Sequence, residues 1–346
     1  MLLLFCNIHM EETMNKTNIP EKLENIYDCF KWMKEQTDKK LKQYPDEKKE
    51  GLYEKKLWKN NFINKQIKRR ENETKEITAK SENSRIEEFQ MEDHIRAMVY
   101  AVCSGNKPWK CTLERTDLDS GRIGDAEEIV KNFMDFLENK ISKEKVISNL
   151  EANIKFRYIE VCKFVENIIY NMEISKEKSF LGNTERTNLQ EINYQIRIFD
   201  EKLNLGNSET KEIKRCIREL AEGKKCKLKG MGIPLVCEYL RNLGCDIPKP
   251  DVHMRNILGK KYIGLLDKDM VSQMKSYDMV MDLAAILKES RRYKEKGECN
   301  ELDINPAGLD YLLWAYCATG YGEFKSIENE KVKSIIQKEY NKYMEK

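Results

Sequence analysis

The sequence lacks the residue patterns that usually hold a metal ion. It has 3 histidines and 11 cysteines among 346 residues, yet no two cysteines stand in CxxC spacing and no two histidines in HxxxH spacing. Zinc sites are typically built from such closely spaced ligands, so we expect no metal site. Several cysteines fall on apolar helix faces, where free thiols pack as small hydrophobes, and this usage indicates a reducing cytoplasm.

Long apolar runs and two-residue alternation are also missing. The opening MLLLFCNIHM is apolar, but it is too short for a signal sequence and has no basic flank. We therefore expect no secretion signal, with Met10 or Met14 as alternative starts. No later segment is apolar over the length that a membrane helix needs. Because no stretch alternates for long and no repeat of fixed period is visible, we expect an all-α fold without repeats.

Charge is abundant but nearly balanced. Charged residues make up 35% and apolar residues 40%, and the net charge is only +3, so a nucleic-acid surface would need local clustering of basic residues. From residue 86 onward, segment after segment repeats apolar residues at three- and four-residue spacing, as amphipathic helices do. We expect a charged helical extension and linker over 1–85 and a helical core over 86–346.

The clearest basic cluster lies in that extension. The segment KKLWKNNFINKQIKRR, residues 55–70, carries seven basic residues and no acidic one. Its apolar residues fall roughly on one helical side, so it is either a solvated helix docked on the core or a basic helix that follows a phosphate backbone. Residues 71–85 are polar, and we expect a linker there.

The most informative stretch is LKGMGIPLVCEYLRNLG, residues 228–244. A helical pattern precedes it, Gly230 and Gly232 allow a sharp turn, and Pro234 suits the first turn of the next helix. Gly244 suits the end of that helix. Unpaired N–H groups at the helix start would form an anion site, for which a DNA phosphate is a common partner. The alternative is an ordinary turn between two helices, without a ligand.

The next stretch, KPDVHMRNIL, places Asp251 where a helix N-cap stands. As a cap, the carboxylate needs no further explanation. A carboxylate at a helix start beside a turn that binds DNA is also suited to attack on a glycosidic bond, because it can stabilise the positive charge that develops on the sugar. The residues alone leave both roles open.

Together, L-x-G-x-G, a helix and P-D-V-H-x-R resemble the helix-hairpin-helix (HhH-GPD) DNA glycosylases, such as endonuclease III and 8-oxoguanine glycosylase, over roughly residues 86–320. The resemblance implies two helical subdomains with an active-site cleft between them. It also implies hydrolysis of the N-glycosidic bond of a damaged or modified base flipped out of duplex DNA, with Asp251 as the catalytic carboxylate. The hairpin, within 228–233, would bind DNA through Leu228, Lys229, Gly230, Met231 and Gly232.

The resemblance extends to flanking residues. The segment 95–109 resembles the family's early helix and the turn after it, where a polar side chain fills the gap left by the flipped base. This implies a wedge role for Asn106, although glutamine is the commoner residue there. Lys107 and Lys110 adjoin the wedge and are expected to contact phosphates. Arg255 is expected to pair with a phosphate or with a core carboxylate.

Two departures limit the implied chemistry. Family members that also cleave the strand carry a lysine two residues after the second hairpin glycine, and Pro234 stands there instead, so we expect hydrolysis only. The C-terminal region holds only Cys299 and Cys317, so we expect no four-cysteine iron–sulfur cluster. The expected cofactor is therefore none, apart from room for a monovalent cation at the hairpin carbonyls. His253 is expected to fix its loop through a hydrogen bond.

The sequence does not identify the base, on which Trp109, Trp314 or Tyr316 could stack. We expect a monomeric, cytoplasmic enzyme that acts on duplex DNA without membrane contact, in base excision repair or in defence against modified foreign DNA. The main alternative is a non-enzymatic helix-hairpin-helix DNA-binding protein, against which Asp251 in its PDVHMR setting argues. A third is a helical scaffold for protein partners, which only the charged N-terminal helices favour.

Overall fold

The computed structural model describes residues 23–43, 89–104, 125–153, 161–178, 186–202, 207–260, 262–290, 305–316 and 327–345. Over these residues the regular elements are helices, and the one β contact is an isolated bridge between Lys178 and Thr187. The predicted all-α class is therefore confirmed. None of the described helices combines the length and apolar character that a bilayer crossing requires.

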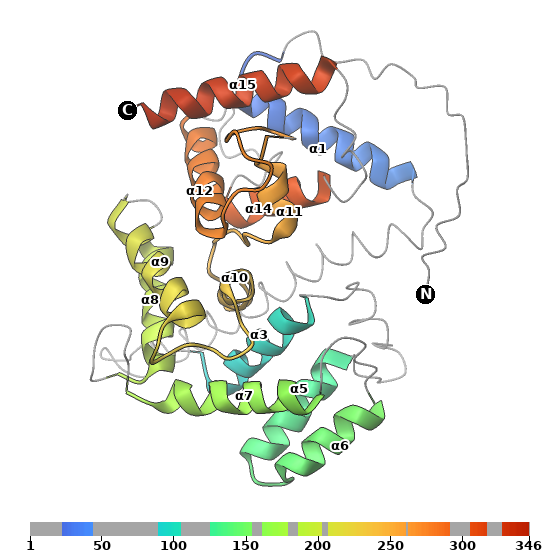
Figure 1. Cartoon of the computed structure of the whole chain (residues 1–346), viewed down its shortest axis with the longest axis vertical. Coiled ribbons are helices and arrows are strands. Elements are labelled where there is room, and N and C mark those ends of the chain that lie inside the picture. The colour runs from blue at the N-terminus through green and yellow to red at the C-terminus, as the bar shows by residue number, and fades with distance from the viewer. Residues whose placement is uncertain are drawn as a thin grey trace, which may run out of the picture.

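The first hydrophobic cluster fills the lower part of the molecule in Figure 1. Its helices are α3 (Met91–Cys103), α5 (Asp125–Leu137), α6 (Lys143–Asn153), α7 (Val161–Lys176), α8 (Asn188–Lys202), α9 (Asn207–Glu222) and α10 (Ile233–Asn242). Helix α3 contacts α5, α7 and α10, and most of its side chains are buried, as expected for a helix with apolar residues around most of its circumference. A reciprocal cap between Gln90 and Asp93 starts it.

The interface between α3 and α10 contains a buried histidine. One ring nitrogen of His94, Nε2, lies 3.0 Å from Oδ1 of Asn193, and the other, Nδ1, lies 2.5 Å from the Tyr239 hydroxyl. Because the amide group of Asn193 donates to the Phe89 carbonyl, its oxygen must accept, so Nε2 carries the imidazole proton. Burial lowers the pKa of His94 to about 4, which keeps the ring neutral at neutral pH.

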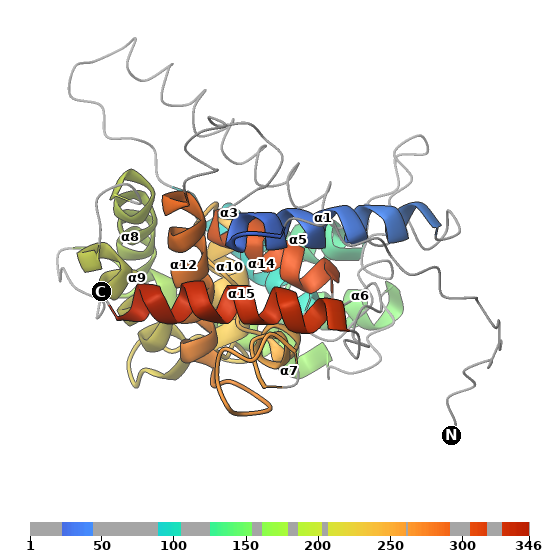
Figure 2. The ribbon, with the colours of Figure 1, turned by 90° about the horizontal axis from the view of Figure 1, so that it is seen from above.

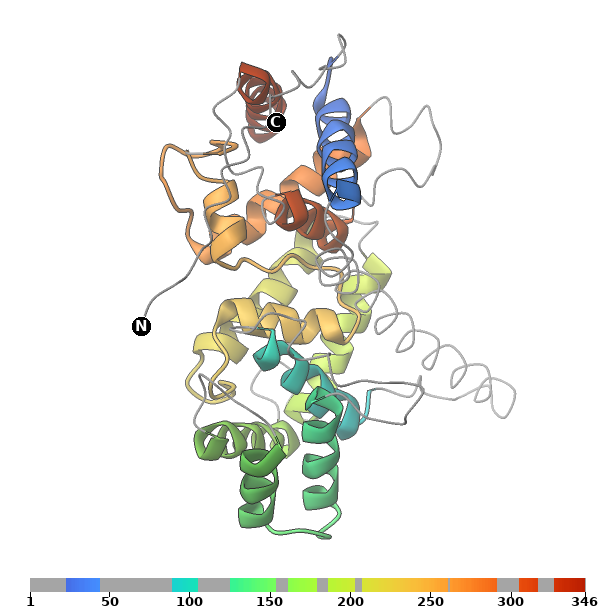
Figure 3. The same ribbon diagram turned by 90° about the vertical axis from the view of Figure 1, so that its right-hand side faces the viewer.

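The second hydrophobic cluster lies above the first and brings together the first and the last described helices (Figures 1 and 3). Its helices are α1 (Ile26–Gln43), α11 (Val252–Ile257), α12 (Gln273–Glu289), α14 (Pro306–Tyr316) and α15 (Ile327–Met344). Helices α1 and α15 contact each other and run alongside one another in Figure 2. Part of the expected 1–85 extension thus belongs to this cluster, with Phe30 and Met33 buried in it. The basic segment 55–70 and the linker lie outside the described residues.

The chain passes from the first cluster to the second after the end of α10. Gly244 has a φ of +91°, its N–H donates to the Arg241 carbonyl, and the N–H of Cys245 donates to the Leu240 carbonyl. These bonds satisfy the last carbonyls of the helix through a left-handed glycine, as predicted for Gly244. The chain then crosses to α11 through residues 245–251, so Asp251 stands at the junction of the two clusters.

Candidate functional site

The hairpin at residues 228–232 turns between α9 and α10 with its apolar side chains inward. Leu228 and Met231 are buried, and the Met231 N–H donates to the Leu228 carbonyl over 3.3 Å. Gly230 has a φ of +74°, a left-handed conformation that strains other residues. Lys229, Gly230 and Gly232 are exposed. The hairpin residues therefore divide into two that anchor the turn and three that face solvent.

One face of α7 supports this turn from behind. Asn171, which is buried, donates from Nδ2 to the Lys229 carbonyl over 3.1 Å and accepts the Lys229 N–H at Oδ1 over 2.7 Å. Tyr170 places its ring under the Lys229 ammonium, 3.7 Å from Nζ to the centroid. A Cβ added at Gly230 would lie 2.7 Å from Nδ2 of Asn167. Sequence reasoning missed these α7 residues, because no local signal links them to the hairpin.

The start of α10 offers unpaired donors. Its N-cap is Gly232, which provides no side-chain hydrogen bond, and Pro234 stands in the first turn as predicted. Among the described residues, the N–H groups of Gly230, Gly232 and Ile233 have no acceptor. Gly232 has a φ of −84°, and a Cβ there would meet only the Pro234 ring at 4.0 Å. Unlike Gly230, it is therefore not needed for the turn itself but leaves these donors open to an anion.

Asp251 is the N-cap of α11, as the sequence predicts. Its Oδ1 accepts the N–H groups of His253 and Met254 over 3.0 and 3.1 Å. Its other oxygen, Oδ2, accepts no hydrogen bond from the part of the chain that the structure describes. The side chain is half-buried. One oxygen thus caps the helix while the second stays available for another contact.

Arg255 and His253, which follow Asp251 in the same motif, make different contacts. Arg255 donates from Nε to the Val271 carbonyl over 2.6 Å, and within the described chain it pairs with no core carboxylate. Its contact with a phosphate stays a prediction. Its partner residue donates back, from the Val271 N–H to the Arg255 carbonyl. The His253 ring is exposed, and its expected hydrogen bond to the loop is not found among the described residues. Only the backbone N–H of His253 holds the loop.

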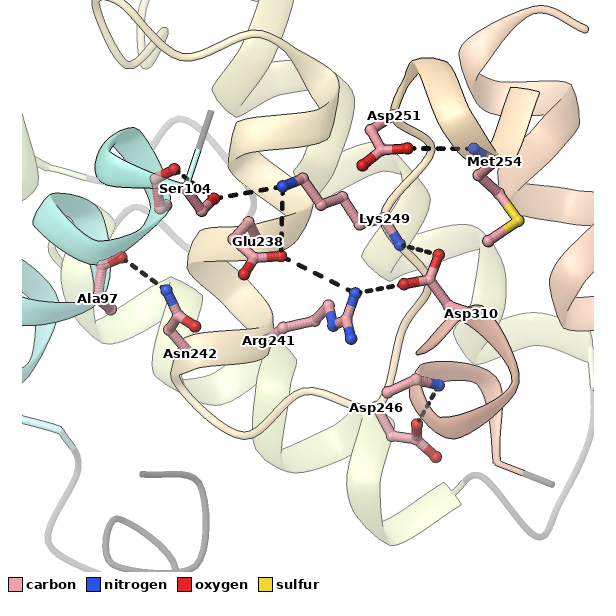
Figure 4. A network of polar contacts seen from close by, with 12 residues as sticks. Ala97, Ser104, Glu238, Arg241, Asn242, Asp246, Lys249, Asp251, Met254 and Asp310 are labelled. Carbon is pink, nitrogen blue, oxygen red and sulfur yellow. Dashed lines mark hydrogen bonds and ion pairs between the residues drawn. The ribbon is translucent and has the colours of Figure 1, made fainter. Parts of the chain in front are cut away.

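Three buried charged side chains and one half-buried lysine lie between α3, α10, α14 and the segment before Asp251 (Figure 4). Arg241 donates to Asp310 over 2.6 Å, and Glu238 lies 3.9 Å from the same guanidinium nitrogen. Lys249 reaches from the other side, with Nζ 3.8 Å from Glu238 and 3.2 Å from the Ser104 hydroxyl. We call Glu238, Arg241, Lys249 and Asp310 the buried charge cluster.

The balance of charges in the cluster keeps the arginine ionised. Burial alone would lower the pKa of Arg241, but the carboxylates of Asp310 and Glu238 raise it above its ordinary value. No local pattern predicts this cluster, because Asp310 is 69 positions from Arg241 and occupies a mostly apolar helix. Lone charged residues in a pattern of this kind are usually solvent-facing.

Several expected site residues cannot be placed. Helix α3 ends at its C-cap, Ser104. The described residues stop there, and four expected site residues lie outside them: Asn106, Lys107, Trp109 and Lys110.

Of the aromatic residues expected to stack on a base, Tyr316 is excluded by burial: it packs against Trp32 with ring centroids 6.3 Å apart. Trp314 is half-buried beside Tyr311. Stacking by Trp314 remains a hypothesis, whereas Tyr316 belongs to the second hydrophobic cluster.

No group of three histidine, cysteine or acidic side chains within the described ranges is arranged to hold a metal ion.

Comparison with known proteins gave no match: no family model, no curated protein and no solved structure is detectably similar to the chain.

Proposed function

We propose that this protein is a DNA glycosylase that hydrolyses the N-glycosidic bond of a base flipped out of duplex DNA. The observation that carries the proposal is the placement of Asp251. Its carboxylate keeps one oxygen without a hydrogen bond from the described residues, and it lies at the junction of the two hydrophobic clusters, nine residues after the helix that begins at the hairpin. The sequence resemblance alone does not require that the carboxylate that caps α11 keep one oxygen without a hydrogen bond.

The hairpin and the start of α10 would hold the DNA backbone. The unpaired N–H groups of Gly230, Gly232 and Ile233 suit a phosphate, because the start of a helix carries partial positive charge. The Lys229 ammonium adds a full charge beside them. These contacts do not read sequence; they fix the duplex in register so that one base can leave the stack.

Asp251 would act on the sugar of the extruded nucleotide. As the bond to the base breaks, positive charge builds on the sugar ring, and the free Oδ2 can stabilise that charge or orient the attacking water. The backbone N–H groups of His253 and Met254 at Oδ1 hold the carboxylate in place. Since Pro234 has no amine, the step ends in an intact abasic strand.

The test is incubation with a panel of duplexes that carry oxidised, alkylated, mismatched or hypermodified bases, with mass spectrometry of the released bases. We expect release of at least one base class by the wild type, and release at least about a hundredfold slower by Asp251→Asn. Duplex binding without any release would favour the non-enzymatic DNA-binding protein. Absence of duplex binding would leave the helical scaffold.

A further inference from the structure

Asp310 connects three parts of the proposed site. Its Oδ2 accepts from Arg241 of α10 over 2.6 Å, and its Oδ1 accepts the backbone N–H of Lys249 over 3.2 Å. Asp310 itself belongs to α14 in the second hydrophobic cluster. One carboxylate therefore ties together the helix that follows the hairpin, the segment that leads to Asp251, and the opposite cluster.

The main chain of Lys249 lies close in sequence to Asp251, the residue proposed to act on the sugar. Only Pro250 separates Lys249 from Asp251, and the Asp251 N–H donates back to the Lys249 carbonyl over 2.8 Å. Proline restricts its own φ, so this short turn has little freedom. Fixing the Lys249 N–H therefore fixes the point from which the Asp251 side chain projects.

Helix α10 carries the other end of the connection. The hairpin lies at its start and Arg241 in its last turn, and ten residues of helix span about 15 Å. The Lys249 ammonium also binds Ser104, where α3 ends and the segment with the expected wedge begins. Helix α10, the end of α3 at Ser104 and the segment that leads to Asp251 thus all meet at the same buried charge cluster (Figure 4).

Stability alone does not account for this arrangement. Arg241 and Asp310 are 4% and 6% exposed, and buried ion pairs often stabilise a fold no better than apolar side chains of similar size. The Nε of Arg241 is buried without a hydrogen-bond partner in the described chain, which costs further free energy. A role in position and orientation, rather than in stability, fits a pair with these properties.

We propose that the Arg241–Asp310 ion pair is a positioning element, which sets the Asp251 carboxylate relative to DNA held at the hairpin. The inference rests on the proposed function. It assigns neither residue to the chemical step: both act through the main chain of Lys249. Loss of the pair should leave DNA binding intact and slow base release, because small displacements of a catalytic group are costly in rate.

The test replaces the pair with apolar residues, in the double variant Arg241→Met/Asp310→Leu, so that no unpaired charge remains buried. A matched control is Lys214→Met/Asp278→Leu, which removes an ion pair of 2.6 Å that also joins α9 of the first cluster to α12 of the second. Single-turnover base release, duplex affinity and hydrogen exchange of the amides over 249–254 are measured for both variants and the wild type.

We expect the double variant at 241 and 310 to bind the duplex like the wild type, to release base about 10- to 100-fold more slowly, and to exchange the 249–254 amides faster. The control should change none of these. A wild-type rate in the folded double variant would overturn the inference. If that variant does not fold, Asp310→Glu keeps the charge but lengthens the side chain, and its unchanged rate would overturn the inference equally. A wild type that releases no base from any duplex would instead count against the proposed function.

Discussion

The carboxamide of Asn171 forms two hydrogen bonds with the main chain of Lys229, one in each direction. The two residues are 58 positions apart, and Asn171 is fully buried. The hairpin therefore does not take its shape from its glycines alone. Helix α7 holds its main chain from behind, and this leaves the opposite, exposed side free to meet a ligand.

The two hairpin glycines should respond differently to substitution. Gly230→Ala forces an alanine into a φ of +74° and places Cβ against Asn167, so we expect a loss of about 1–3 kcal/mol in the free energy of unfolding. Gly232→Val places its Cβ in ordinary contact with the Pro234 ring at 4.0 Å and should fold normally, but its side chain would obstruct a phosphate at the start of α10. Urea unfolding and duplex affinity check both. A Gly232→Val protein that binds duplex DNA like the wild type would contradict the proposed phosphate contact.

Local features of the site could be predicted because they depend on neighbouring residues. The LKGMG turn, Pro234 in the first helical turn, Gly244 at the helix end and the cap at Asp251 each follow from backbone geometry within a few positions. The helical pattern also located most of the helices, for the same reason.

The rest depends on contacts between distant segments. No sequence pattern near Asn171 predicts its contact with Lys229, and none near Asp310 predicts its contact with Lys249. Such pairs form only once the helices pack. The same holds for α1: its charged sequence suggests an extension, yet Phe30 is fully buried in a cluster of C-terminal helices. A periodic pattern shows that a helix has an apolar face, but not which other segment covers it.

His94 should make stability depend on pH. Its pKa is about 4 when folded, against an ordinary value of 6.5, so between these values the unfolded chain binds more protons. The contribution of the neutral His94 ring to the free energy of unfolding is thus fully present above pH 6.5. It falls as the pH drops toward 4, by about 3 kcal/mol in total. Urea unfolding at several pH values checks this, with His94→Gln as the control. Identical pH dependence of the two proteins from 6.5 to 4 would contradict it.

The basic segment 55–70 should contribute to the salt dependence of DNA binding if it follows the phosphate backbone. Deleting residues 1–85 is not a suitable test, because it removes α1 from the second cluster. Replacing the seven basic residues by glutamine should lower the slope of log affinity against log salt by about 0.9 for each lost phosphate contact. Lys→Gln changes at the exposed Lys331, Lys338 and Lys342 of α15 serve as the control. An unchanged slope would mean that the segment only packs on the protein.

The strand should stay uncut. Because Pro234 has no amine to attack the sugar, borohydride added during turnover should trap no protein–DNA adduct, and gels should show an intact abasic strand until alkali is added. An adduct would show that another amine forms an imine with the sugar. Lys249 would then be the first candidate to substitute, as Lys249→Met, since it lies two residues before Asp251 and carries the nearest described amine along the chain.

The two roles of Asp251 can be separated by asparagine. In Asp251→Asn, the amide oxygen can still accept the N–H groups of His253 and Met254, so unfolding should cost at most about 1 kcal/mol less than in the wild type. The neutral amide cannot balance a sugar cation or accept a proton from water, so base release should fall by at least about a hundredfold, with duplex affinity unchanged.

Asp246→Asn is the matched control, because Asp246 also accepts a backbone N–H at a helix start, from Ala307 of α14 over 2.9 Å. It should lose a similar amount of stability and keep the full rate of base release. Equal rates in the two variants and the wild type would reduce Asp251 to a helix cap and remove the residue on which the proposed reaction depends. A selective loss in Asp251→Asn would instead assign to the Asp251 carboxylate a chemical role beyond that of a helix cap.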